Sequence, residues 1–203
     1  MTKNAVSFYM VATCVMVAAA PGRFACGFAL AFSVCFLMLT GTLFRALLKK
    51  LRLEQMEFLL MASFIVFATM FVRQLLAIMM PEMALQLGFA LYLPSVSTFT
   101  TLFLFERKER GVKSALKDIM RPTLVFSAYS LGCALIRDVL GYGTITLPAF
   151  GRMYEQVVAD PERISMCSFL ATVPGALTLC ALLLAAYLAV ERKMKVLETA
   201  GLV

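Results

Sequence analysis

Six cysteines are the residues of this chain best suited to chemistry, because a thiolate can act as a nucleophile or bind a metal. None of them belongs to a Cys-x-x-Cys pair, and the sequence contains no histidine. Mixed Cys/His metal sites and Ser–His or Cys–His catalytic arrangements are therefore excluded. Walker and dinucleotide-binding glycine motifs are also missing. Buried, unreactive thiols are the simpler interpretation of Cys14, Cys26, Cys35, Cys133, Cys167 and Cys180.

Some ionisable residues lie within or at the ends of long apolar runs, where charge is costly and often functional. Arg73 stands in the second half of its run, close enough to the end for its side chain to snorkel to the membrane surface in a structural role. Arg137 and Asp138 close another run. They are expected to form either an internal ion pair or an anchor for lipid headgroups.

The elements that position these residues are apolar segments. The mean hydropathy is +0.88, and 62% of the 203 residues are hydrophobic while 15% are charged, which is too little polar surface for a soluble globule. A helix that crosses a bilayer core of roughly 30 Å needs about 17 to 25 apolar residues. Six runs near this length occupy residues 5–20, 24–44, 58–80, 83–105, 120–136 and 166–190.

The pattern within these runs indicates helices. They are continuous and do not alternate with period two, as the strands of a membrane barrel would. The sequence therefore predicts an all-α membrane protein with about six transmembrane helices, forming a single polytopic domain over residues 1–203. The longest connection, residues 141–165, mixes glycine, proline and charged residues and is expected to be a re-entrant or surface loop.

The distribution of lysine and arginine predicts the orientation. With six spans, fourteen of these residues fall on the side that holds both termini, three fall on the other side, and Arg73 and Arg137 belong to spans. The positive-inside rule then places the N- and C-termini in the cytoplasm. The net charge of +7 comes from short loops beside the membrane, so no nucleic acid partner is expected.

The start of the chain allows a second interpretation. Lys3, an apolar stretch and the three alanines Ala18 to Ala20 also fit a cleavable secretory signal peptide. Cleavage would leave five spans and an external N-terminus.

One segment resembles a known family. Residues 132–144 read Gly-Cys-Ala-Leu-Ile-Arg-Asp-Val-Leu-Gly-Tyr-Gly-Thr, and the run that begins at Gly27 and the Tyr-Leu-Pro segment at Tyr92 also match. Together they resemble the six-helix D/E-type membrane subunits of the Rnf and Nqr electron-transport complexes, of the RnfE and NqrD type. The resemblance covers roughly the whole chain. It implies two inverted three-helix halves, about 1–81 and 82–203, in the inner membrane of a bacterium.

The resemblance also implies a function and partners. Such a complex couples the oxidation of ferredoxin or NADH to cation movement, and the subunit pairs with an oppositely oriented homologous subunit. Four cysteines from the two subunits hold a [2Fe-2S] cluster in the family. Cys14 falls where one ligand is expected, whereas Thr100 stands at the position of the other, and Arg73 replaces an expected glutamate.

Threonine cannot offer iron a soft thiolate, so several functions remain open. The chain is a redox subunit of the complex, a cofactor-free structural or assembly subunit, a degenerate paralogue, or a small unrelated membrane transporter. The cysteine pattern favours a cofactor-free subunit over a redox subunit. None of these alternatives is an enzyme on its own.

Overall fold

The computed structural model describes residue 16 and residues 18–97, 112–149, 153–158 and 168–199. Four helices in this part of the chain are long and apolar enough to cross a membrane. They confirm the prediction of a helical membrane protein. The spans are Phe24–Lys50, Glu57–Met79, Pro122–Tyr142 and Val173–Val190, and they belong to helices α2 (Phe24–Lys50), α3 (Glu57–Met79), α7 (Val112–Arg137) with the turn that follows it, and α9 (Val173–Thr199).

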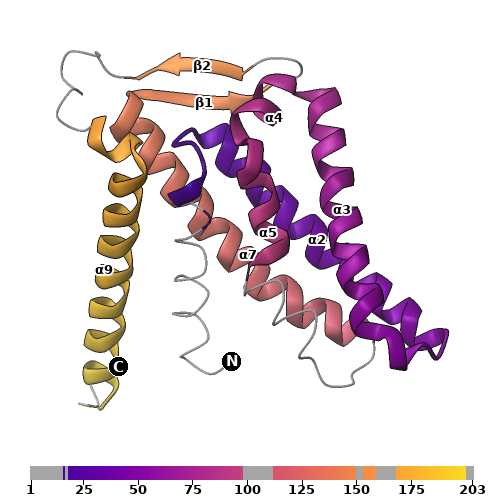
Figure 1. Ribbon diagram of the computed structural model, residues 1–203. Helices are drawn as coiled ribbons and strands as arrows, with labels where there is room; N and C mark the ends of the chain where they lie inside the picture. Colours follow the sequence, from indigo (N-terminus) through magenta and orange to yellow (C-terminus); the bar gives the residue numbers. More distant parts are fainter. Residues whose placement is uncertain (1–15, 17, 98–111, 150–152, 159–167, 200–203) are drawn as a thin grey trace.

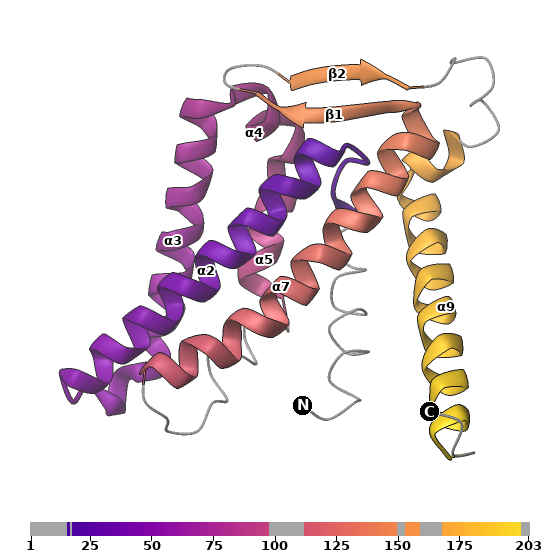
Figure 2. The ribbon, with the colours of Figure 1, turned by 180° about the vertical axis from the view of Figure 1, so that it is seen from behind.

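Two of these helices form the centre of the molecule. α2 and α7 run antiparallel and make the most extensive helix–helix contact of the described chain, while α3 and α9 flank the pair on opposite sides (Figures 1 and 2). The central helices cross closely at Gly27, where an added Cβ would overlap the Cβ of Ala134. Small residues permit such an approach, and packing of this kind replaces the hydrophobic effect as the force between helices in lipid.

The fourth predicted span is broken where the structure describes it. Instead of one helix from residue 83, the chain forms α4 (Pro81–Leu87), the 3-10 turn η2 (Gly88–Tyr92) and α5 (Leu93–Val96). Gly88 has a φ of +45°, in the left-handed region that favours glycine, and it ends α4. This prediction is described only as far as Ser97, and the first predicted span lies almost entirely outside the described residues.

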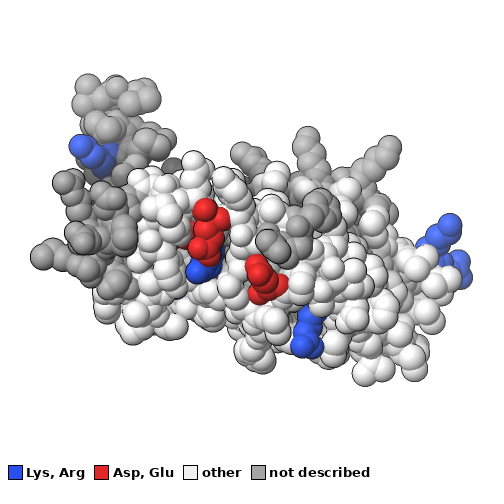
Figure 3. Space-filling model, turned by 90° about the horizontal axis from the view of Figure 1, so that it is seen from above, with Lys and Arg blue, Asp and Glu red and all other residues white. Residues whose placement is uncertain are grey.

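The long connection contains a β-hairpin, which the all-α prediction missed. Strands β1 (Thr144–Pro148) and β2 (Met153–Val157) pair antiparallel, with Leu147 opposite Tyr154. The hairpin lies across one end of the helices (Figure 1), and most of β2 is exposed, as expected of a surface connection. Charged side chains are sparse on this end of the described molecule (Figure 3), and two of them, Arg23 and Glu155, form an ion pair.

Basic residues mark the opposite end. α2 ends at Lys49 and Lys50, α7 begins one residue before Lys113, and α9 ends after Arg192 and Lys193. All three helix ends lie away from the hairpin (Figure 2). The structure therefore gathers these three basic segments at one end, as the alternating loops of the sequence predicted.

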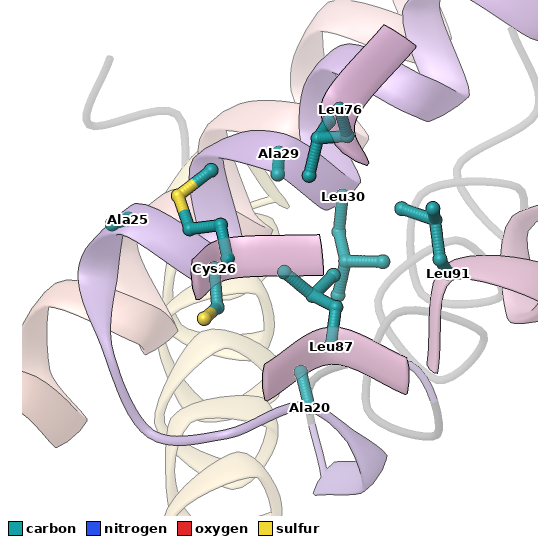
Figure 4. Close-up of a cluster of buried hydrophobic side chains, with 9 residues drawn as sticks. Ala20, Ala25, Cys26, Ala29, Leu30, Leu76, Leu87 and Leu91 are labelled. Carbon is teal, nitrogen blue, oxygen red and sulfur yellow. The ribbon is translucent and has the colours of Figure 1, made fainter. Parts of the chain in front are cut away.

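A cluster of buried aliphatic side chains joins the broken segment to the central helices. Leu30 of α2, Leu76 of α3 and Leu87 of α4 meet there with Leu91 of η2 (Figure 4). A second cluster lies further along α2, around Val34 and the residues of α3 and α7 that pack against it. The broken segment is thus fixed by packing against α2 and α3.

Candidate functional site

The residues that carry the family resemblance lie at a distinctive backbone position. α7 ends at Arg137 and continues into one π-helical turn, η3 (Asp138–Tyr142), a geometry that is frequent at functional sites. Gly143 then adopts a left-handed φ of +67° and starts the path into β1. The side chains of Arg137 and Asp138 are 1% and 0% exposed. This burial shows that the prediction of a lipid-headgroup anchor is wrong.

Asp138 binds the beginning of a helix that is distant in sequence. Its Oδ2 accepts hydrogen bonds from the backbone N–H of Phe24 at 3.1 Å and of Thr146 at 2.7 Å, and from the Thr146 hydroxyl at 2.7 Å. Its Oδ1 accepts a hydrogen bond from the Thr144 hydroxyl at 3.2 Å. Phe24 is the first residue of α2, whose own N-cap, Arg23, makes no side-chain cap. The carboxylate therefore stabilises the positive end of the α2 dipole.

Arg137 binds the carbonyl oxygens of two other segments. Nη1 donates to Ala20 O at 3.0 Å, where the helical segment before α2 ends. Nη2 donates to Ala171 O at 3.2 Å and Nε to Leu170 O at 3.3 Å. Both acceptors belong to the 3-10 turn η4 (Ser168–Ala171), which leads into α9. A guanidinium suits this task because its donors have a fixed planar geometry.

Two glycines allow the chain to approach these side chains. A Cβ on Gly22 would lie 3.1 Å from Cε2 of Tyr142, and a Cβ on Gly141 would lie 3.0 Å from the backbone N of Ala171. Both distances leave no free room for a side chain. We call Arg137, Asp138, Thr144 and Thr146 the polar node.

The polar node joins the start of α2, the turn before α9, the hairpin and the segment that ends at Ala20. The apolar pattern of the sequence pointed to its two charged residues, but their backbone partners and the two threonines were not predicted. The available signal was the Thr-x-Thr pattern directly after Gly143.

The cysteines that the structure describes lie in apolar packing or beside a single polar group. Cys35 Sγ is 3.3 Å from the Ser127 hydroxyl, and Cys133 and Cys180 are buried together with Leu179. Cys26 Sγ donates to Gln86 Oε1 at 3.8 Å. Cys14, Cys167 and Thr100 lie outside the described residues.

The residue that the family resemblance predicts as a [2Fe-2S] ligand, Cys14, lies outside the described part of the chain. In that part no three Cys, His, Asp or Glu side chains are grouped so that they could hold a metal ion. Thr100, where the family resemblance implies a second thiolate, has a hydroxyl instead.

Arg73 forms a second polar site, on the outside of the helices. Its side chain is exposed on α3, and Nη1 donates to the phenol oxygen of Tyr92 at 2.7 Å. The guanidinium carbon also lies 5.6 Å from the centre of the Tyr92 ring, within cation–π range. The described contacts of Arg73 are thus with the neighbouring turn η2.

No protein-family model, curated protein or solved structure matches this chain.

Proposed function

We propose that this chain is a membrane subunit of an ion-translocating electron-transport complex of the Rnf/Nqr type, in the inner membrane of a bacterium. The complex couples the oxidation of ferredoxin or NADH to cation movement. The observation that carries the proposal is the location of the resemblance: residues 132–144, which match the family best, include Arg137, Asp138 and Thr144 of the polar node. These residues join the start of α2, the turn before α9 and the hairpin, so proteins that share this fold would need them.

The arrangement of the helices supports the proposed topology of six spans in two inverted halves, 1–81 and 82–203. α2 and α7 would be equivalent helices of the two halves, and they are antiparallel at the centre. α3 and α9 would be the next equivalent pair, and they lie on opposite flanks. Inverted repeats of this kind are common in membrane transport proteins.

The basic helix ends support the proposed orientation. The ends of α2 and α9 and the start of α7 gather away from the hairpin, and this is the cytoplasmic end by the positive-inside rule. Both termini are then cytoplasmic, and the hairpin faces the outside. An oppositely oriented homologous subunit is the expected membrane partner.

The second candidate function is that of a cofactor-free structural subunit of the same complex. Thr100 and the separation of the described cysteines favour it. The break between α4 and α5 also suits a small unrelated transporter, because interrupted helices line many transport sites. The family motif around Arg137 favours the complex over the transporter.

Purification of the tagged chain from native membranes tests the proposal. We expect flavin- and iron–sulfur-containing subunits in a stoichiometric complex, and we expect membrane vesicles that lack the chain to lose ferredoxin- or NADH-driven cation uptake. A chain that purifies without such subunits, from membranes whose redox-driven uptake is independent of it, contradicts the proposal.

Iron and acid-labile sulfide in the purified complex distinguish the redox subunit from the structural one. A decrease of both by the content of one [2Fe-2S] cluster in the Cys14→Ser complex, with no decrease in Cys35→Ser as a matched control, establishes participation in a cluster. Unchanged iron in both variants establishes the cofactor-free role.

A further inference from the structure

The outward face of α3 carries a cation within an apolar span. Arg73 stands six residues before the end of α3 at Met79, which is ~9 Å at the rise of an α-helix. Among the residues that the structure describes, the polar partner of its guanidinium is the neutral phenol of Tyr92, and no carboxylate pairs with it. An exposed charge at this depth is costly unless something outside the chain compensates it.

The direction of the side chain opposes contact with the nearer membrane surface. Side chains of an α-helix lean toward its N-terminus, so Arg73 leaves α3 toward the middle of the span. Tyr92 keeps the guanidinium in this direction. Its phenol also donates to Sδ of Met70 at 3.9 Å, and Met70 lies almost one helical turn nearer the middle of the span. Snorkelling to the headgroups beside Met79 would require the opposite direction.

The residues around Arg73 form an exposed apolar face. Val66, Met70 and Arg73 follow the i, i+4, i+7 spacing of one helix face, and the two apolar residues are 58% and 52% exposed. Phe89 is 79% exposed, and its ring lies 6.2 Å from that of Tyr92. Exposed apolar side chains on a membrane helix can face lipid or another helix, so the charge of Arg73 is what distinguishes this face. We call these five residues the Arg73 surface.

We propose that the Arg73 surface binds a transmembrane helix of a partner subunit that carries an aspartate or glutamate at the same depth. Tyr92 orients the guanidinium and leaves other N–H donors free for a carboxylate, which forms its strongest hydrogen bonds with such a group. The inference rests on the proposed function for the existence of a membrane partner.

A second copy of this chain fits the Arg73 surface less well than a different subunit. The exposed acidic residues that the structure describes lie near helix ends or on the hairpin: Glu82 at the start of α4 and Glu155 in β2. Neither is near the middle of a span. No Asp or Glu of the sequence falls within the six apolar runs, so the complementary carboxylate belongs to another protein.

Photocrosslinking in native membranes locates the partner. The probe p-benzoylphenylalanine replaces Phe89 in one full-length variant and Ile78 in the control, because Ile78 is equally exposed at 76% but lies on another face of α3. We expect a specific protein adduct from position 89 and at least about tenfold less of it from position 78. Adducts with lipid alone from position 89 overturn the proposal.

Charge substitutions then test the ion pair. Arg73→Gln lowers the yield of the position-89 adduct by at least about tenfold, whereas Arg73→Lys retains most of it and Arg192→Gln, at the basic end, leaves it unchanged. Mass spectrometry of the adduct identifies the partner helix. Arg73→Glu combined with an arginine at the partner carboxylate restores the yield, and failure to restore it, or an adduct insensitive to Arg73→Gln, overturns the proposal.

The outcomes also separate this inference from the proposed function. A redox complex that assembles without a protein adduct at position 89 refutes the Arg73 surface and leaves the proposed function standing. A charge-dependent adduct with a protein outside any redox complex refutes the proposed function and leaves the Arg73 surface standing.

Discussion

Two arginines of this chain lie at membrane depth, and their environments are opposite. Arg137 is buried and donates to three backbone carbonyls of its own chain, whereas Arg73 is exposed and contacts one phenol. The apolar segments around them look alike in sequence. The cost of placing a charge within the membrane is thus compensated inside the subunit for Arg137, whereas for Arg73 its compensation is left to a neighbouring protein.

Removal of the buried guanidinium is expected to have the largest effect on folding. Arg137→Met leaves the carbonyls of Ala20, Leu170 and Ala171 without their donor in a buried site and should destabilise the fold by about 3–5 kcal/mol, since each unsatisfied acceptor costs about 1–3 kcal/mol. Thermal unfolding in detergent measures this loss. Arg137→Lys should recover part of it, because an ammonium reaches fewer of the three acceptors. If Arg137→Met kept the wild-type melting temperature, Arg137 would contribute no more to the stability of the subunit than Arg73 is expected to.

The contrast between interior and surface extends to two glycines. Gly27→Ala places a methyl group against Ala134 and should cost about 1–3 kcal/mol through overpacking of α2 against α7. Gly132→Ala, on α7, is the matched control, since its Cβ would meet nothing within 4 Å. It should stabilise the helix by up to about 1 kcal/mol. Opposite shifts of the unfolding midpoint are expected, and equal shifts would contradict the close crossing.

The threonines give a finer test of the polar node. Thr146→Val keeps the shape of the side chain but removes the hydroxyl that binds Asp138 at 2.7 Å and accepts from Ala25 N at 3.3 Å. A loss of about 1–2 kcal/mol is expected. Thr144→Val, which removes the longer 3.2 Å hydrogen bond, should lose less, as chemical unfolding of the two variants can show. A larger loss in Thr144→Val than in Thr146→Val would show that the hydrogen bond to Oδ1 of Asp138 contributes more stability than the one to Oδ2.

Substitution of the exposed arginine should have the smallest effect on the isolated chain. Arg73→Gln removes contacts with Tyr92 alone and is expected to change the free energy of unfolding in detergent by no more than about 0.5 kcal/mol. Unfolding measurements on the purified subunit provide the test. A loss comparable to that of Arg137→Met would show that Arg73 stabilises the subunit itself.

Sequence reasoning predicted the long helices because their apolar length is a local property. α2 and α3 begin and end within a few residues of the predicted spans, except that α2 extends to Lys50. The break at Gly88 was harder to predict, since the residues on both sides of it are apolar and only the φ of +45° reveals it. The hairpin was missed because its β-branched residues lie in a connection rich in turn signals.

The candidate site was predictable only in part. Charge within or at the end of an apolar run pointed to Arg73, Arg137 and Asp138, but the neighbouring residues do not show which arginine is buried. The partners explain why. Phe24 and Asp138 are separated by 114 positions, and Ala20 and Arg137 by 117, so only the folded helices bring them together.

The long separation between Phe24 and Asp138 has a consequence for biosynthesis. A ribosome completes α2 long before it reaches the aspartate that caps it, so this helix enters the bilayer with its first N–H groups unsatisfied by that carboxylate. Closure of the bundle becomes a late event, which follows membrane insertion and waits for synthesis of η3 and β1. Until then the helices of the nascent chain are inserted but not yet joined by the hydrogen bonds of Asp138. Membrane chaperones and quality-control proteases act on chains in this state.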